Sequence, residues 1–202
     1  LCDVLMANPP FAGEVKQTYL LAPYELAHKL NKDGTPGKLE NAVGRDLLFI
    51  ERNLDFLRPG GRMAVVLPQG RFNNASDHRV REFIAERCRI LAVVGLHPNT
   101  FKPHTGTKTS VLIVQKWNDD PDAGPLCPKA EDYNIFFATQ RKESKDTSGD
   151  KRYEPDGKGG YLRDAHGHWV VQHDLFNHDG LTADGIAEAF VEFAKKERLS
   201  FF

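Results

Sequence analysis

The alternation of short apolar runs with amphipathic stretches constrains the fold of this chain most. Apolar side chains recur at helical spacing over residues 46–57, and Arg58-Pro59-Gly60-Gly61 is expected to end that helix. The same reasoning predicts a second amphipathic helix, opened by Ser76 or Asp77, and three apolar strands. In order, the expected elements after residue 45 are the helix 46–57, the strand 63–67, the helix 80–89 and the strands 90–96 and 110–114. Strands that alternate with helices favour an α/β fold with a mostly parallel sheet covered on both faces.

The connection between the strands 90–96 and 110–114 is short and contains no helical pattern. Parallel neighbours need a crossover of about a dozen or more residues, which is usually helical. We therefore expect the last of these strands to run antiparallel. Earlier in the chain, residues 4–7 form a short buried strand and residues 20–30 are a candidate helix.

Composition sets broad limits. The 202 residues are 40% hydrophobic and 27% charged, which fits one globular domain, or a domain with an appendage. The net charge of −1 gives no whole-chain signature of nucleic-acid binding, so a DNA contact must come from a local patch or a partner. Three widely spaced cysteines suggest neither a disulfide framework nor a metal site, and a reducing cytoplasm is expected. No stretch approaches the ~20 apolar residues of a membrane span. Because the chain begins at Leu1 inside an apparent strand, it resembles a piece of a longer protein.

Asn8-Pro9-Pro10-Phe11 directly follows the strand 4–7 and is the motif that points to a reaction. Two prolines fix φ near about −65° and remove two backbone donors, so the turn is stiff and rich in carbonyl acceptors. If the Asn8 side-chain oxygen and the Pro9 carbonyl accept the two hydrogens of an aromatic amine, its nitrogen becomes more nucleophilic. Phe11 would then stack on a flipped base. A plain Pro-Pro turn with Phe11 in the core is the open alternative.

Three stretches together resemble the methylation subunit of type I restriction-modification systems, an N-6 adenine-specific DNA methyltransferase family. They are residues 3–11, 44–74 and 91–116. The resemblance implies the second half of a Rossmann-like, S-adenosylmethionine-dependent methyltransferase sheet. In that sheet the spatial strand order here would be 3–7, 63–67, 110–115, 90–96, with one antiparallel strand.

The resemblance also implies S-adenosylmethionine as cofactor in the full-length protein. Methyltransferases of this kind hold it through an acidic or aromatic residue and a Gly-x-Gly turn after the first strand. The nearest sequence here, residues 156–160, follows a polar run and is expected to be a flexible loop. No cofactor-binding residue is therefore assigned, and this chain alone is expected to be inactive. The exposed flank of the first strand is expected to self-associate or to be disordered.

Further candidates for substrate binding lie in two loops. Arg71 and Asn73 follow the strand 63–67 and could contact the nucleotide or its phosphate, although a capping turn is equally compatible. The resemblance places Phe101 in a loop facing the target base, where an apolar anchor is the alternative. Lys108, with neighbouring basic side chains, could contact phosphates. The catalytic assignment is Asn8, Pro9, Pro10 and Phe11.

The C-terminal part is less informative. Predicted domains are residues 1–117 (partial catalytic domain), 118–160 (polar linker with one strand near 134–138) and 161–202. This last segment is expected to be a small α+β extension, with a hairpin turn at 164–167 and a helix over 187–193. The histidines between residues 166 and 178 fit no compact zinc pattern, so no metal is predicted. No internal repeats are recognised.

These observations predict part of an enzyme that transfers a methyl group from S-adenosylmethionine to the N6 amine of adenine in DNA. The resemblance implies DNA, a specificity subunit and a restriction subunit as candidate partners, in the cytoplasm of a bacterium or archaeon. One alternative is a non-catalytic fragment that contacts DNA or another subunit. Another is a methyltransferase for protein glutamine or RNA, but such enzymes more often carry tyrosine at the fourth motif position and lack the 44–74 pattern.

Overall fold

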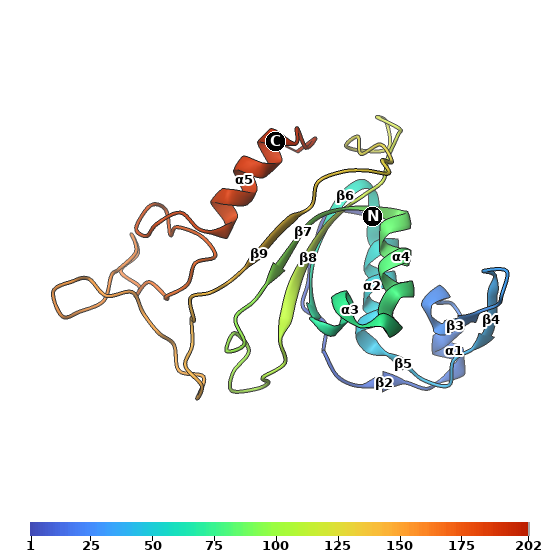
Figure 1. Cartoon of the computed structure of the whole chain (residues 1–202), viewed down its shortest axis with the longest axis horizontal. Coiled ribbons are helices and arrows are strands. Elements are labelled where there is room, and N and C mark those ends of the chain that lie inside the picture. The colour runs from blue at the N-terminus through green and yellow to red at the C-terminus, as the bar shows by residue number, and fades with distance from the viewer. Residues whose placement is uncertain (202) are drawn as a thin grey trace. The chain divides into compact units, whose positions relative to one another are not determined.

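The computed structural model describes residues 1–201, and its main feature is a five-stranded sheet (Figure 1). Its strands, in spatial order, are β1 (Cys2–Ala7), β6 (Leu57–Pro68), β8 (Thr109–Lys116), β7 (Cys88–Gly95) and β9 (Phe136–Thr139). The predicted α/β class and the predicted order of the first four strands are confirmed. The strand expected near 134–138 is β9, which pairs beyond β7.

Strand direction also follows the prediction. β1 runs parallel to β6, with Leu5 opposite Met63. β9 runs parallel to β7. β8 is reversed against β7: the Leu96 N–H donates to the Thr109 carbonyl at 2.9 Å, and the Trp117 N–H donates to the Arg87 carbonyl at 3.0 Å. As residue numbers rise along β7, the numbers of the partner residues on β8 fall. The two strands are therefore antiparallel, as expected for a connection without a helix.

The chain forms two compact parts. The first consists of residues 1–91 and 112–133, and the second consists of residues 92–111 with the residues from 134 onward. The domain boundaries expected at residues 117 and 160 stay a prediction.

Two helices cover β6 and its neighbours in the first part. α2 (Arg45–Phe56) and α4 (His78–Arg87) confirm the two predicted amphipathic helices. Their apolar faces meet the alternate buried side chains of β6; the buried set includes Ile50, Leu54, Met63, Val65, Leu67, Phe83 and Ile84. Asp77 precedes α4 but makes no capping hydrogen bond, because its carboxylate binds Arg71 instead.

β6 begins earlier than residue 63. α2 ends at Phe56, and residues 58–61, expected only to terminate the helix, already belong to the strand. The pairing of β1 with β6 is irregular between Cys2 and Val4. Gly60 has a φ of +71°, and a side chain there would collide with the Pro125 carbonyl. A glycine sequence that usually ends helices serves here as an irregular strand start.

The segment between β1 and α2 is made of small elements. They are β2 (Glu14–Val15), α1 (Thr18–Leu21), the 3-10 turn η1 (Glu25–Ala27), β3 (His28–Leu30), β4 (Pro36–Leu39) and β5 (Val43–Gly44). The prediction of a helix over 20–30 was wrong, because Pro23 interrupts the segment and β3 pairs with β4. Leu21, Ala27 and Val43 form a buried cluster with Leu48 of α2. This cluster holds the segment between β1 and α2 against α2.

Two short helical turns, α3 (Gly70–Asn73) and η2 (Ala75–Asp77), join β6 to α4.

In the second part, α5 (Ile186–Lys196) confirms and extends the helix predicted over 187–193. The Phe136 ring of β9 packs on Phe190 and Phe193 of α5, with ring centroids 5.5 and 5.6 Å apart. The predicted hairpin turn at 164–167 is also present, since the Gly167 N–H donates to the Asp164 carbonyl at 3.0 Å.

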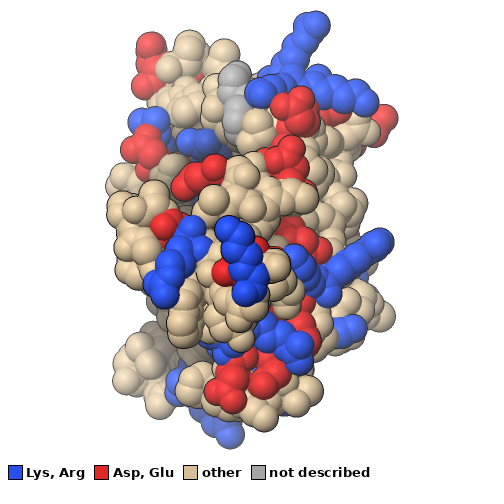
Figure 2. Space-filling model, turned by 90° about the vertical axis from the view of Figure 1, so that its left-hand side faces the viewer, with Lys and Arg blue, Asp and Glu red and all other residues tan. Residues whose placement is uncertain are grey.

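Charged side chains of both signs are intermingled on the face that Figure 2 shows. This agrees with the net charge of −1. Within residues 1–201, no helix is long and apolar enough to cross a membrane.

Candidate functional site

The Asn8 to Phe11 turn lies at the carboxyl end of β1, the edge of an open α/β sheet where ligands bind. Asn8 is exposed, and its side chain forms no hydrogen bond with any residue in 1–201. Pro9 is buried, Pro10 is exposed and Phe11 is half-buried. The side-chain oxygen of Asn8 is therefore available to a ligand, while the buried Pro9 ring anchors the corner.

A cavity of about 530 Å³ adjoins Phe11. This volume lies in the range of roughly 300–1,000 Å³ typical of small-molecule sites. The segment after the tetrapeptide, the start of α2 and the region around the start of α4 form its walls. Its lining residues include Phe11, Gly13, Glu14, Leu26, Glu40, Asp46, Leu47, Arg71, Asp77 and Arg79. Phe11 and Arg71, both predicted site residues, thus meet on one cavity, whereas Asn8, Pro9, Pro10 and Asn73 do not line it.

Arg71 is held between two buried carboxylates. Its Nε and Nη2 donate to the two oxygens of Asp46 at 2.7 and 3.0 Å, and its Nη1 donates to Asp77 at 2.7 Å. Burial lowers the pKa of Arg71, but the hydrogen bonds and charge of Asp46 and then Asp77 outweigh burial, so the pKa lies above its ordinary value. The two carboxylates outweigh the guanidinium, so the group of three carries a net negative charge. Arg71 is therefore better suited to shape the cavity wall, or to donate to a neutral base edge, than to bind a phosphate.

Sequence reasoning missed the functional meaning of Asp46 and Asp77. The sequence places residue 46 at the start of a predicted helix and offers Asp77 as a candidate cap, and neither pattern predicts a contact with Arg71. The clamp joins Arg71 to a residue 25 positions away, and no local pattern signals such a pair. The cavity's polar wall became visible only in the fold.

The outer wall of the cavity is anchored by charged side chains of both helices. Glu51 of α2 accepts hydrogen bonds from the backbone N–H groups of Glu25 and Leu26, at 2.7 and 2.9 Å. Arg79 of α4 donates to the carbonyls of Glu25 and His28. Side chains of α2 and α4 thus hold the segment between β1 and α2 through its backbone. A mobile wall would lose the shape of the cavity, so these contacts position the site.

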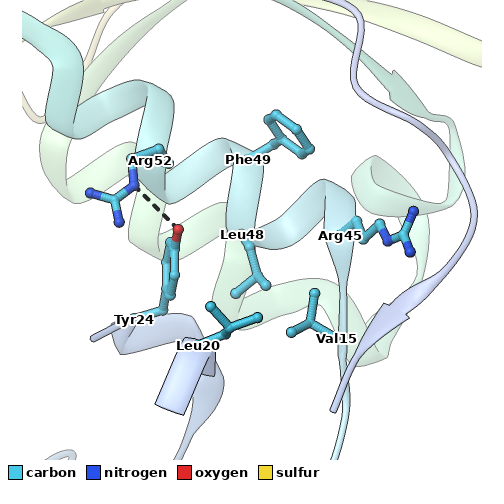
Figure 3. A pocket seen from close by; sticks show the side chains of 7 residues that line it. All are labelled: Val15, Leu20, Tyr24, Arg45, Leu48, Phe49 and Arg52. Atoms are coloured by element: carbon cyan, nitrogen blue, oxygen red, sulfur yellow. Dashed lines mark hydrogen bonds between the residues drawn. The ribbon is translucent and has the colours of Figure 1, made fainter. Parts of the chain in front are cut away.

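A smaller cavity of about 260 Å³ lies beside α2 (Figure 3). Val15, Leu20 and Leu48 point toward one another there, and the Tyr24 hydroxyl accepts a hydrogen bond from Arg52 Nε at 3.2 Å. Its lining is mainly apolar. None of the predicted site residues lines it.

Phe101 and Lys108 belong to the second part of the chain. Phe101 is half-buried in the loop between β7 and β8, and Lys108 is exposed just before β8. Asn73, in the first part, is exposed at the end of α3. Among the described residues, no group of three or more His, Cys, Asp or Glu side chains is arranged to hold a metal ion.

Comparisons with known proteins agree with this architecture. The family model described as N-6 DNA methylase matches residues 1–156. The EcoEI methylase subunit of a type I restriction enzyme from Escherichia coli is 29% identical over 115 residues, which are 56% of this chain and 21% of that protein. The chain thus spans about a fifth of that curated relative. A solved structure from Listeria monocytogenes, described as a class I S-adenosylmethionine-dependent methyltransferase, has a TM-score of 0.53 at 22% identity. The match covers 68% of this chain and 36% of that chain and shows a shared fold. The chain belongs to the N-6 DNA methylase family.

Proposed function

We propose that this chain carries the catalytic tetrapeptide of a DNA methyltransferase that methylates the N6 amine of adenine in the cytoplasm of a bacterium or archaeon. One observation carries the proposal: an accessible Asn8 follows β1, and Phe11, three residues on, lines a cavity of about 530 Å³. The match of residues 1–156 to the N-6 DNA methylase model supports the same chemistry.

In this proposal the Asn8 side-chain oxygen and the Pro9 carbonyl accept the two amine hydrogens of a flipped adenine. Accepting both hydrogens localises the lone pair on the nitrogen, and the interaction strengthens as the nitrogen gains positive charge in the transition state. The Phe11 ring offers a face that replaces part of the lost base stacking. We also propose Arg71 and Asn73 as polar contacts to the nucleotide, and Phe101 and Lys108 as further DNA contacts.

S-adenosylmethionine would supply the methyl group. The glycine-rich turn 156–160 does not fit a cofactor site, because Asp156 accepts hydrogen bonds from its own backbone at Lys158 (2.7 Å) and Gly160 (2.9 Å). These bonds, first the one from Lys158, lower the pKa of Asp156. We assign no cofactor-binding residue within the described chain, and we propose that residues outside it hold the cofactor.

We propose DNA and a specificity subunit as partners, with a restriction subunit in the same assembly. The mixed charges seen in Figure 2 favour a local DNA contact over a whole-surface one. β1 is an edge strand with two exposed apolar side chains, Val4 (52% exposed) and Met6 (82%), and Leu1 (86%) directly precedes it. Such an edge pairs readily with another strand, so we also propose self-association of the isolated chain. The same edge favours the second candidate function, a non-catalytic fragment that contacts another subunit.

Replacing Asn8 tests the proposal in a longer protein that contains this chain and methylates DNA. Loss of one positioned polar group typically slows such a step about 10²–10³-fold. Asn8→Ala should lower methyl transfer to this extent while leaving cofactor binding unchanged, measured by incorporation of radiolabelled methyl groups and by calorimetry. Asn41→Ala is the matched control, because Asn41 is also exposed and lies in the same segment. Near-normal turnover of Asn8→Ala would refute the catalytic role and favour the non-catalytic fragment.

A further inference from the structure

Residues 153–172 contain an eight-residue repeat that the sequence analysis did not recognise. An aromatic residue recurs at Tyr153, Tyr161 and Trp169. Within the first two copies, Asp156 and Asp164 stand at the same position, and Gly159 and Gly167 follow at another. The glycines and charges suggested an ordinary loop, which hid the period.

The repeat closes on itself. The Leu162 N–H donates to the Glu154 carbonyl, the Val170 N–H donates to the Leu162 carbonyl, and the Glu154 N–H donates to the Val170 carbonyl, each at 2.9 Å. Because the third segment bonds back to the first, the three segments form the sides of a triangle instead of a flat hairpin. The eight-residue spacing places equivalent side chains at equivalent corners.

The aromatic side chains of the repeat gather at one place, which we call the aromatic triad: Tyr153, Tyr161 and Trp169. Ring centroids lie 5.5 Å apart for Tyr153–Tyr161, 5.1 Å for Tyr153–Trp169 and 5.5 Å for Tyr161–Trp169. A pure packing cluster would bury its rings, yet Tyr161 and Trp169 are each 48% exposed. The triad therefore presents preorganised aromatic surface to solvent.

Charge near the triad is asymmetric. Asp156 and Asp164 each accept two backbone N–H bonds within their own turns, and Glu154 forms an ion pair with Lys142. Arg152, at the entry of the repeat, pairs with Glu143, whereas Lys151, Lys158 and Arg163 form no ion pair within residues 1–201. The Arg163 guanidinium also lies over the Trp169 ring, 5.8 Å from its centroid. The carboxylates of the repeat are occupied, whereas Lys151, Lys158 and the remaining donors of Arg163, whose Nη1 donates to the Gly167 carbonyl at 2.7 Å, are available to a ligand.

We propose that the aromatic triad is a contact site for unpaired DNA bases, with Lys151, Lys158 and Arg163 meeting the phosphates. Exposed aromatic faces beside free cations are the combination that binds single strands without sequence preference. Its role as a second DNA contact rests on the proposed function, but binding to it is measurable without methyl transfer. Single-strand binding is measured with the chain alone and methyl transfer with Asn8→Ala, so failure of either proposal is recognised separately.

Trp169 provides a direct reporter. The chain has two tryptophans, so Trp117→Phe leaves Trp169 as the sole emitter. Titration with a 12-nucleotide single-stranded DNA should quench its fluorescence saturably, because stacking on a base quenches indole emission. A 12-nucleotide abasic strand has the same phosphates and should bind more weakly with little quenching. Equal binding of both strands, or tighter binding of the matching duplex or RNA strand, would overturn the proposal.

Variants separate stacking from structure. Tyr161→Ala should weaken binding of the 12-nucleotide strand about 5- to 150-fold, and Tyr161→Phe should restore it. The control Phe137→Ala, which removes a 71% exposed ring on β9, should bind as the parent does. Lys158→Gln leaves the triad intact and should reduce the slope of log affinity against log salt by about 0.7. Unchanged affinity in Tyr161→Ala, or an unchanged slope in Lys158→Gln, would contradict the site.

Discussion

Replacing Asp46 by Asn tests whether the buried Arg71 clamp holds the cavity wall together. Asp46 accepts two of the three hydrogen bonds that the Arg71 guanidinium donates to the two carboxylates, and its side chain is only 3% exposed. The amide keeps the shape of the carboxylate but has one acceptor oxygen and no charge. One guanidinium donor would then face an NH₂ group inside the protein.

The expected cost follows from burial. Removing one partner of a buried ion pair costs about 3–5 kcal/mol, and Arg71 is 25% exposed and keeps Asp77, so the lower end applies. Asp46 also lies in the first turn of α2, where a negative charge contributes about 0.3–1 kcal/mol. We expect Asp46→Asn to lower the free energy of unfolding by about 3–4 kcal/mol. Asp77→Asn keeps an acceptor oxygen for its single 2.7 Å bond and removes only the charge, so it should cost less, about 1 kcal/mol.

Urea unfolding of the 202-residue chain measures these values. A Trp169→Phe background leaves Trp117, in the first part, as the fluorescent reporter. The double variant Asp46→Asn/Arg71→Met should be more stable than the sum of the single losses predicts, by about 0.5–3 kcal/mol. Glu192→Gln, which breaks an exposed pair with Lys195, is the control and should change nothing measurable. A loss below about 1 kcal/mol for Asp46→Asn, or strict additivity with Arg71→Met, would refute the clamp.

Two further predictions concern the core and the cavity wall. Burial raises the pKa of Cys88 to about 12 and of Cys127 to about 11, so at pH 8 Ellman's reagent should label only the exposed Cys2 until the chain is unfolded; fast labelling of a second thiol in the folded chain is the contrary result. Since the fold favours the protonated thiols, their contribution to stability is complete below about pH 9 and declines as the pH approaches 11–12. Glu51→Gln leaves a single acceptor oxygen for the two N–H groups of Glu25 and Leu26, and amide hydrogen exchange at these residues should accelerate about 5- to 150-fold; unchanged exchange would show that Glu51 does not anchor the wall.

Elements that depend on a local pattern could be predicted from the amino-acid sequence. Apolar periodicity located α2, α4, β7 and β8, because amphipathic spacing reports which face of a segment is buried, whatever covers it. The short helix-free connection before β8 determined its reversed direction, since chain geometry forbids a short parallel return. The tetrapeptide at Asn8 likewise marked the position of the candidate site, because its rigidity is a property of the prolines themselves.

Contacts between residues far apart in the chain became visible only in the folded protein. Arg71 was a candidate ligand contact in the sequence, but its partners Asp46 and Asp77 arrive from other elements and turn it into a clamped wall residue. The aromatic triad shows the same limit, because Tyr153, Tyr161 and Trp169 are eight residues apart and meet only when the third segment bonds back to the first. A local pattern fixes which side of a segment is apolar. Which segments then face each other depends on the entropy cost of bringing distant parts of the chain together. It also depends on electrostatics, because a charge is buried only where a partner of opposite charge compensates it.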